Sequence, residues 1–322
     1  MEERFAYSAF PGRLATPLAG AVLGATVVVS SGLSLAGATR AAVVVMALGV
    51  AGTSLFARWM LRSGVLTAPW QRSESSNLVA TRGATEPAVW LVAHLDSKSQ
   101  PIPSAIRAAG VTLLASAVVL AVAGLLMALA GAPARAIAWG AIALGVAGAL
   151  PVMASVVGTR SDGAVDNASG VAAVLAAAAL IAPVVAVGVL LPSAEELGLA
   201  GARAWARRRP RGTALNCDGV DDGGALVLMY NHPAPVRVLK TVQAIAQSVR
   251  GDSARARRMP FGLLTDSTAL ASAGWQALTV SHGALATLGR VHTSRDSLAN
   301  LRGSSIATVA DVLARSATAL AT

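Results

Sequence analysis

Four long apolar runs, each bounded by arginines, dominate the pattern of hydrophobic and polar positions along the chain. They cover residues 14–39, 41–57, 108–134 and 136–159. Each approaches or exceeds the roughly 20 apolar residues that cross a bilayer core as a helix. The connections within the first pair and within the second pair are too short for anything but helical turns. The pattern therefore predicts two transmembrane hairpins, with helices over about 14–39 and 41–61 and over about 108–132 and 136–158.

Two alternatives would also account for apolar runs of this kind. A cleaved signal peptide would account for the first run only, and that run starts 13 residues in and is followed at once by a second span. Four buried core helices of a soluble protein would account for all of them. Composition favours the membrane, because only 13% of the residues are charged, against roughly 25% in average soluble domains.

The rest of the chain alternates short apolar runs with helical patterns. Strands are expected over 89–93, 184–191, 213–216, 225–229 and 276–280, and helices over 166–181, 197–209, 236–249 and 304–320. Such alternation predicts a three-layer α/β domain with a mainly parallel central sheet. The expected organisation is an N-terminal segment with a hairpin (1–72), a first domain piece (73–103), an inserted hairpin (104–159) and the rest of the domain (160–322).

The charge pattern predicts a binding partner for the protein and an orientation in the membrane. The formal net charge is +10, with 26 lysines and arginines against 16 acids. In so hydrophobic a chain this excess favours an anionic lipid surface over nucleic acid as the partner. Most of the arginines that flank the hairpins lie on the side of the two domain pieces, which predicts a multi-pass protein with its α/β domain in the cytoplasm. The lone Cys217 excludes an internal disulfide and a cysteine-based zinc finger. No oligomeric state is indicated.

Metal-ligating residue types recur in five strings at or just beyond the ends of expected strands, where open α/β sheets place their sites. The strings are VAHLDS with His94 and Asp96, GAVDNASGV with Asp166, PSAEELGLAG with Glu195 and Glu196, NCDGV with Asp218, and VHTSRDSL with His292. Two imidazoles and three carboxylates suffice to hold two divalent ions. Nitrogen and oxygen donors without thiolate suit zinc, with cobalt or manganese as possible substitutes. A further carboxylate is then needed as a general base.

The ordered set of strings resembles the co-catalytic zinc aminopeptidases of metallopeptidase family twenty-eight, over residues 78–301 once the 108–159 hairpin is excised. The resemblance implies a peptide substrate and two Zn²⁺ held by His94, Asp166, Glu196, Asp218 and His292. It also implies that Glu195 is the general base and that Asp96 acts as a catalytic residue by fixing the His94 ring. The same family holds glutaminyl cyclase-like enzymes, so an acyl transferase or another amide hydrolase is one alternative. A catalytically dead membrane scaffold is another.

Several residues keep alternative interpretations. Asp166 could cap a helix, Glu195 and Glu196 could begin one, and Asp218 could belong to a turn with Asp221 and Asp222. Four other titratable residues are secondary candidates. Asp266 and His282 are candidates for the substrate side, although Ser267 replaces the histidine that the family often has after the aspartate. Asp296 is expected near His292 or as a helix cap, and His232 in a loop.

Overall fold

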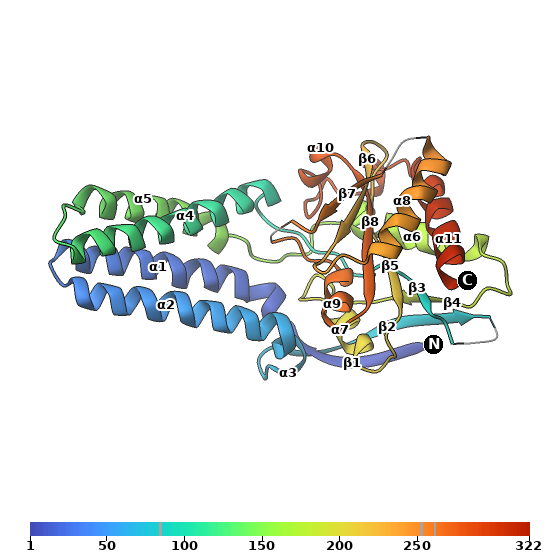
Figure 1. Ribbon diagram of the computed structural model, residues 1–322, viewed down its shortest axis with the longest axis horizontal. Coiled ribbons are helices and arrows are strands. Elements are labelled where there is room, and N and C mark those ends of the chain that lie inside the picture. The colour runs from blue at the N-terminus through green and yellow to red at the C-terminus, as the bar shows by residue number, and fades with distance from the viewer. Residues whose placement is uncertain (84–85, 252–253, 261) are drawn as a thin grey trace. The chain divides into compact units, whose positions relative to one another are not determined.

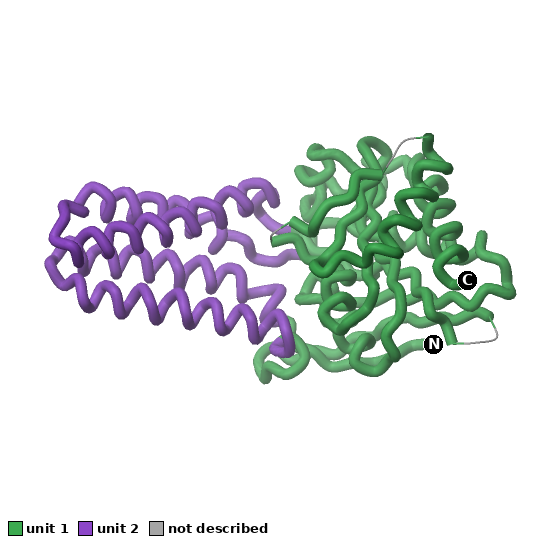
Figure 2. The backbone as a smooth tube through the Cα atoms, in the orientation of Figure 1, with its two compact units in different colours: residues 1–9, 65–99, 159–322 green, residues 10–64, 100–158 purple. Residues whose placement is uncertain are grey.

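The computed structural model describes residues 1–83, 86–251, 254–260 and 262–322. The chain forms two compact units, each made from separate stretches of sequence (Figure 2). Unit 1 contains Met1–Ala9, Val65–Ser99 and Thr159–Thr322, and unit 2 contains Phe10–Gly64 and Gln100–Gly158. The predicted division at residue 72 thus differs from the observed one, because the residues on either side of the first hairpin belong to the α/β unit.

Unit 2 is helical and apolar almost throughout (Figure 1). Its long helices are α1 (Thr16–Leu35), α2 (Thr39–Trp59), α4 (Ser104–Leu129) and α5 (Arg135–Met153), and irregular turns extend α1 and α2 at η1 (Pro11–Ala15) and η2 (Met60–Gly64). Among the described residues, four helices are long and apolar enough to cross a membrane. The predicted pairs of apolar helices are confirmed. The last helix ends at Met153, five residues earlier than expected.

Small residues allow the helices of unit 2 to approach closely, as is common between membrane helices. Helix α5 packs against both α4 and α1. A Cβ atom on Gly148 of α5 would lie 2.5 Å from the backbone nitrogen of Leu114 in α4. A Cβ atom on Gly24 of α1 would lie 2.6 Å from the Cβ of Ala149. Gly24 and Gly148 are therefore packing positions.

Gly148→Ala is expected to destabilise unit 2, whereas Gly32→Ala is not. The added methyl group at 148 meets backbone atoms that cannot move aside, and such overpacking costs about 1–3 kcal/mol. Gly32 lies in α1 with nothing within 4 Å of its Cβ position, so there the higher helix propensity of alanine acts alone. Thermal unfolding in detergent compares the two variants. Equal effects of the two substitutions would show that the close α4–α5 approach contributes nothing.

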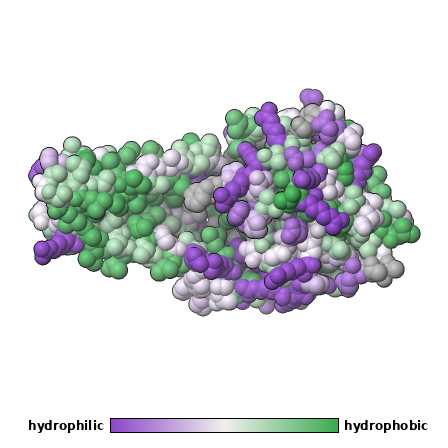
Figure 3. All heavy atoms as spheres, viewed as in Figure 1, coloured by the Kyte–Doolittle hydropathy of each residue, from purple (hydrophilic) through white to green (hydrophobic). Residues whose placement is uncertain are grey.

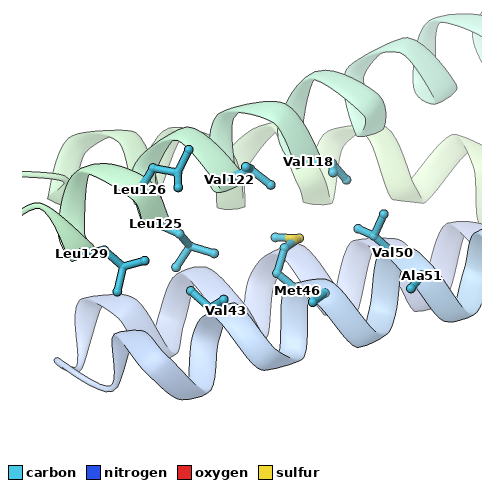
Figure 4. A pocket seen from close by; sticks show the side chains of 10 residues that line it. Val43, Met46, Val50, Ala51, Val118, Val122, Leu125, Leu126 and Leu129 are labelled. Atoms are coloured by element: carbon cyan, nitrogen blue, oxygen red, sulfur yellow. The ribbon is translucent and has the colours of Figure 1, made fainter.

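An apolar groove of about 380 Å³ runs between α2 and α4 (Figure 4). Its lining is entirely apolar, and α2 contributes every third or fourth residue from one face. The lining residues are Val43, Met46, Ala47, Val50, Ala51, Val118, Val122, Leu125, Leu126 and Leu129. None of them offers a nitrogen or oxygen ligand for a metal ion or a group that transfers a proton, so the chemistry of this protein is to be sought in unit 1. The surface in view agrees, since hydrophilic residues gather on unit 1 and hydrophobic ones on unit 2 (Figure 3).

Unit 1 is built on a mixed sheet that has eight strands within the described residues, in the order β1-β2-β4-β3-β5-β8-β6-β7. The strands are β1 (Glu2–Ser8), β2 (Arg72–Arg82), β3 (Val89–Val92), β4 (Val187–Leu191), β5 (Thr213–Val220), β6 (Ala225–Tyr230), β7 (Arg255–Arg258) and β8 (Gln276–Gly283). The four central strands β4, β3, β5 and β8 are mutually parallel. Antiparallel pairs join β1 to β2, β2 to β4 and β6 to β8.

Helices cover both faces of this sheet, which makes three layers (Figure 1). Side chains of a strand alternate between faces, and β3 shows this clearly. Val89 and Leu91 join a core with α6 (Gly170–Leu180), α8 (Val236–Arg250) and α11 (Ile306–Ala321). Trp90 and Val92 join the other core with α7 (Ala200–Ala206) and α9 (Asp266–Ser272), where Trp205 is fully buried. The predicted three-layer α/β fold with a mainly parallel sheet centre is confirmed.

Candidate metal centre

The candidate ligands converge because the central strands are parallel and their carboxyl ends meet at one edge of the sheet. His94 follows β3 by two residues, and Glu195 and Glu196 follow β4. Asp218 lies near the end of β5, and His292 lies beyond β8 and the short helix α10 (Leu285–Leu288). Asp166 lies in the irregular turn η3 (Ala164–Ser169) before α6.

The D-N-A-S-G string explains how Asp166 is brought to β5. The side-chain amide of Asn167 donates to the Cys217 carbonyl (2.9 Å), and its oxygen accepts from the Gly219 N–H (3.1 Å). Asp218 lies between these two residues. The Asp166–Asn167 peptide bond is cis. The N-cap of α6 is Ser169, so the alternative that Asp166 caps this helix is wrong.

The first group of candidate ligands is His94, Asp166 and Asp218, whose potential ligand atoms lie within 4.8 Å of one another. The Nε2 atom of His94 is 3.1 Å from Asp166 Oδ1 and 3.8 Å from Asp218 Oδ1. The Nδ1 atom of His94 lies 2.9 Å from the Asp96 carbonyl oxygen. Because a carbonyl can only accept, Nδ1 carries the hydrogen of the bond to Asp96, and Nε2 faces the two carboxylates. A metal ion would take the lone pair of Nε2 in place of its hydrogen.

The second group is Asp166, Glu196 and His292. The Nε2 atom of His292 is 2.9 Å from Asp166 Oδ2 and 3.0 Å from Glu196 Oε1. His292 has φ = 65°, a strained conformation for a histidine and one that clusters at functional sites. The two oxygens of Asp166 thus point to different histidines. Asp166 is the shared member of both groups.

The donor set fits divalent metal ions. Each group offers one imidazole nitrogen and two carboxylate oxygens, the ligand types that zinc takes in open catalytic sites. Glu196 Oε1 and His292 Nε2 are buried, and their 3.0 Å contact is not a well-aligned hydrogen bond, whereas buried polar atoms in proteins are nearly always satisfied. Burial would raise the pKa of Asp166, but hydrogen bonds from His292 and His94 hold it well below its usual value. The two imidazoles thus favour the ionised form of Asp166, which is the form that binds a metal ion.

Two further aspartates hold the backbone of the ligand-bearing segments. The carboxylate of Asp96 accepts from the N–H groups of Glu195 (3.0 Å) and Glu196 (3.1 Å). That of Asp296 accepts from Val165 (2.6 Å) and Asp166 (3.2 Å). The predicted contact of Asp96 with the His94 ring is therefore made by its carbonyl, while its carboxylate orients the Glu195–Glu196 turn. Asp296 acts near Asp166 rather than as a helix cap.

Glu195 belongs to neither ligand group, although it lies among their charges. Its side chain is buried, and it lies five residues before α7, so it does not begin that helix. Burial raises the pKa of Glu195 well above its usual value, and the charges of Glu196, Asp266 and Asp218 raise it further against the opposite effect of His94. A carboxyl group with a raised pKa beside a metal site has the properties of a proton carrier.

The neighbours of Asp218 have structural partners of their own. The carboxylate of Asp221 binds Arg290 (2.5 Å) and Thr287 (2.6 Å), and that of Asp222 accepts from the N–H groups of Arg302 (2.7 Å) and Ser304 (2.8 Å). These bonds tie the segment that carries His292 to the end of β5. The turn residues are therefore distinct from the ligand candidate Asp218.

Other candidates lie apart from the two ligand groups. The His282 ring is buried and bonds through Nδ1 to the Asp221 carbonyl (2.8 Å). Ser267, which stands where the family often has histidine, is buried in a hydroxyl cluster with Thr265 and Thr279. Asp266 is fully buried, and neither of its carboxylate oxygens has a hydrogen-bond partner. Among the described residues, neither Asp266 nor His282 belongs to a ligand group.

One charged residue beside the ligands was missed from the sequence. Lys98 lies in the loop after β3, and its Nζ atom is 2.5 Å from Glu196 Oε2. Burial would lower the pKa of Lys98, but the charges of Glu196 and Glu195 raise it. Its position four residues after His94, in a chain with two lysines, was the available signal.

In protein stripped of metal by a chelator, Asp266→Asn is expected to raise the melting temperature at pH 8 by about 5 °C or more, with a smaller change at pH 4. Burial raises the pKa of folded Asp266 to about 8, whereas an unfolded aspartate loses its proton near pH 4. Between these values the unfolded state binds fewer protons, so stability falls as the pH rises. Asparagine removes this slope. Equal shifts in melting temperature at the two pH values would contradict the assignment.

A three-layer α/β unit with paired imidazole–carboxylate groups at the carboxyl edge of its sheet defines a class of metal-dependent hydrolases. The sequence profile described as Peptidase family M28 matches residues 148–317, which is more than half of the chain. The protein belongs to Peptidase family M28. The matched range includes Asp166, Glu195, Glu196, Asp218 and His292, but not His94, which precedes the inserted hairpin.

Solved structures share the fold. An aminopeptidase from Aneurinibacillus sp. strain AM-1 is 17% identical and has a TM-score of 0.50, with 77% of this chain and 49% of that chain covered. The LapA aminopeptidase of Legionella pneumophila is 14% identical and has a TM-score of 0.51, with 79% and 57% covered. A glutaminyl cyclase from Porphyromonas gingivalis is 15% identical and has a TM-score of 0.48, with 75% and 76% covered.

The chain spans about half the length of the two aminopeptidases it matches. At these identities the likeness concerns the fold alone. A search among curated proteins found no match.

Proposed function

We propose that the protein is a membrane-spanning aminopeptidase that works with two zinc ions. The observation that carries the proposal is the position of Asp166, whose oxygens lie 3.1 Å from His94 Nε2 and 2.9 Å from His292 Nε2. A carboxylate between two such groups suits a bridging ligand. His94, Asp166 and Asp218 would hold one ion, and Asp166, Glu196 and His292 the other. Bound zinc supplies Lewis acidity that lowers the pKa of water and polarises a carbonyl group.

The protein's own residues supply the proton chemistry. Glu195 accepts a proton from the attacking water and returns it to the leaving amine, as a general base and then a general acid. Asp96 holds the Glu195 N–H and so orients the turn on which this carboxylate lies. The carboxylates beside the two proposed ions favour a substrate with a free α-amino group. This preference distinguishes an aminopeptidase from an endopeptidase.

Metal analysis combined with a panel of aminoacyl amides and amino-blocked amides tests this function. We expect two zinc ions per chain and hydrolysis of the free-amine substrates only. One zinc per chain together with cyclisation of N-terminal glutamine would instead indicate a glutaminyl cyclase-like enzyme. The two complete ligand groups favour two ions over one. A protein that binds no metal and hydrolyses nothing would indicate a scaffold.

We further propose that unit 2 spans a bilayer and that unit 1 faces the cytoplasm. Large apolar side chains on all sides of unit 2 support the first point, since Leu48, Leu55 and Val119 are each at least 68% exposed. The arginines that flank the spans support the second. Reporter fusions at the C-terminus test the orientation. An extracellular or periplasmic signal would overturn it.

A further inference from the structure

Lys98 is a buried cation placed against a proposed metal ligand. Its side chain is 15% exposed, and its Nζ atom lies 2.5 Å from Glu196 Oε2. It is held on the loop after β3 between His94 and Ser99, whose hydroxyl accepts from the Arg160 N–H (2.8 Å). The other lysine of the chain, Lys240, is exposed on α8.

The two oxygens of Glu196 have different neighbours. Oε1 lies 3.0 Å from His292 Nε2 and belongs to the second ligand group. Oε2 is bound to Lys98. The Glu196 side chain is 4% exposed, and its backbone N–H is held by Asp96 (3.1 Å). Glu196 is therefore held at its backbone N–H and at its carboxylate. One carboxylate oxygen faces the ligand group, and the other faces the ammonium group of Lys98.

This division matters because a carboxylate can bind a metal ion through one oxygen or through both. A catalytic zinc ion keeps three protein ligands and leaves one coordination position for water or substrate. Asp166, His292 and one oxygen of Glu196 make three. If both oxygens of Glu196 turned to the same ion, the second would occupy the position that water needs.

We propose that Lys98 is a positioning residue that holds Glu196 as a one-oxygen ligand and so keeps a coordination position open on the second ion. This inference rests on the proposed two-metal function. It differs from a purely structural role, in which the Lys98–Glu196 pair only compensates a buried charge. In that case the loss of Lys98 lowers stability and leaves the metal coordination unchanged.

The test uses Co²⁺, whose visible absorption reports coordination number, titrated into metal-free full-length protein in detergent. The variants are K98M, K98R, K98Q and the matched control K240M. We expect wild type, K98R and K240M to bind two Co²⁺ with the same spectrum. K98M should also bind two, but with weaker absorption typical of a higher coordination number. Its kcat should fall about 10–100-fold, as for other residues that orient metal ligands, with KM nearly unchanged. K98Q keeps a polar but uncharged group, and we expect the same spectrum and the same loss of kcat as for K98M. It therefore tests the proposal even if K98M does not fold.

Three results would overturn the proposal. One is a K98M or K98Q spectrum and kcat equal to those of wild type, even if the melting temperature falls. Another is the loss of one Co²⁺ from these variants, which would mean that Lys98 supports binding rather than an open position. The third is a K98R variant as impaired as K98M. A wild-type protein that binds no Co²⁺ would instead refute the proposed two-metal function on which the inference rests.

Discussion

Glu195→Gln is expected to lower kcat by at least about 100-fold while both metal ions stay bound and KM changes little. Glutamine keeps the shape of the side chain but cannot accept the proton of the attacking water. Glu195 belongs to neither ligand group, so the metal content should not depend on its charge. Steady-state kinetics and metal analysis of the same preparation measure both quantities.

The exposed Glu74 on β2 provides the control for this substitution, because Glu74→Gln changes the net charge equally and lies outside the site. Its kcat should match that of wild type. A Glu195→Gln protein with two metal ions and near-normal turnover would remove Glu195 from the mechanism. Loss of metal from it would instead make Glu195 a ligand.

Asp166→Asn is expected to weaken binding of both ions, whereas Glu196→Ala should weaken binding of one. Asp166 faces both histidines, while Glu196 belongs to the second group alone. Replacing even a residue that only orients a ligand typically lowers affinity 10–100-fold, so loss of the bridging ligand should cost at least about 100-fold at each position. Zinc titration with a competing chelator measures the two affinities separately.

Asp311→Asn is the matched control, since Asp311 lies on α11, outside both ligand groups, and pairs with Arg315. It should retain two zinc ions. If Asp166→Asn lost one ion and kept the other at wild-type affinity, Asp166 would not bridge.

The elements that the sequence predicts well are those decided by local pattern. Long uncharged runs predict α1, α2, α4 and α5, and short apolar runs predict the four parallel strands. Strand β1 was missed, although Phe5 and Tyr7 alternate with polar residues, because its partner β2 lies beyond the first hairpin. Strand β7 has the sequence RARR and all four residues exposed, so only its pairing with β6 makes it a strand.

The candidate site likewise has parts that the local sequence predicts and parts that it does not. The motifs point to the residues of both ligand groups, because each string carries its own ligand type at a strand end. They do not show which atom of Asp96 bonds to His94, since that depends on where β4 places the Glu195 and Glu196 N–H groups. Nor do they show the Lys98–Glu196 pair, which joins residues on two different strand-end loops.

The interrupted path of the chain through unit 1 has a consequence for biosynthesis. The ligands of the first group lie on both sides of the second hairpin, with His94 before α4 and Asp166 after α5. The ribosome therefore releases both hairpins before Asp218 and long before His292. Domains fold as units during synthesis, from the N-terminal side onward. Strands β1, β2 and β3 are therefore synthesised before the central strands β4, β5 and β8, and the second hairpin is synthesised in between. Neither candidate ligand group is complete until both hairpins and most of unit 1 have been synthesised, so any metal site made from them forms late in the life of each new chain.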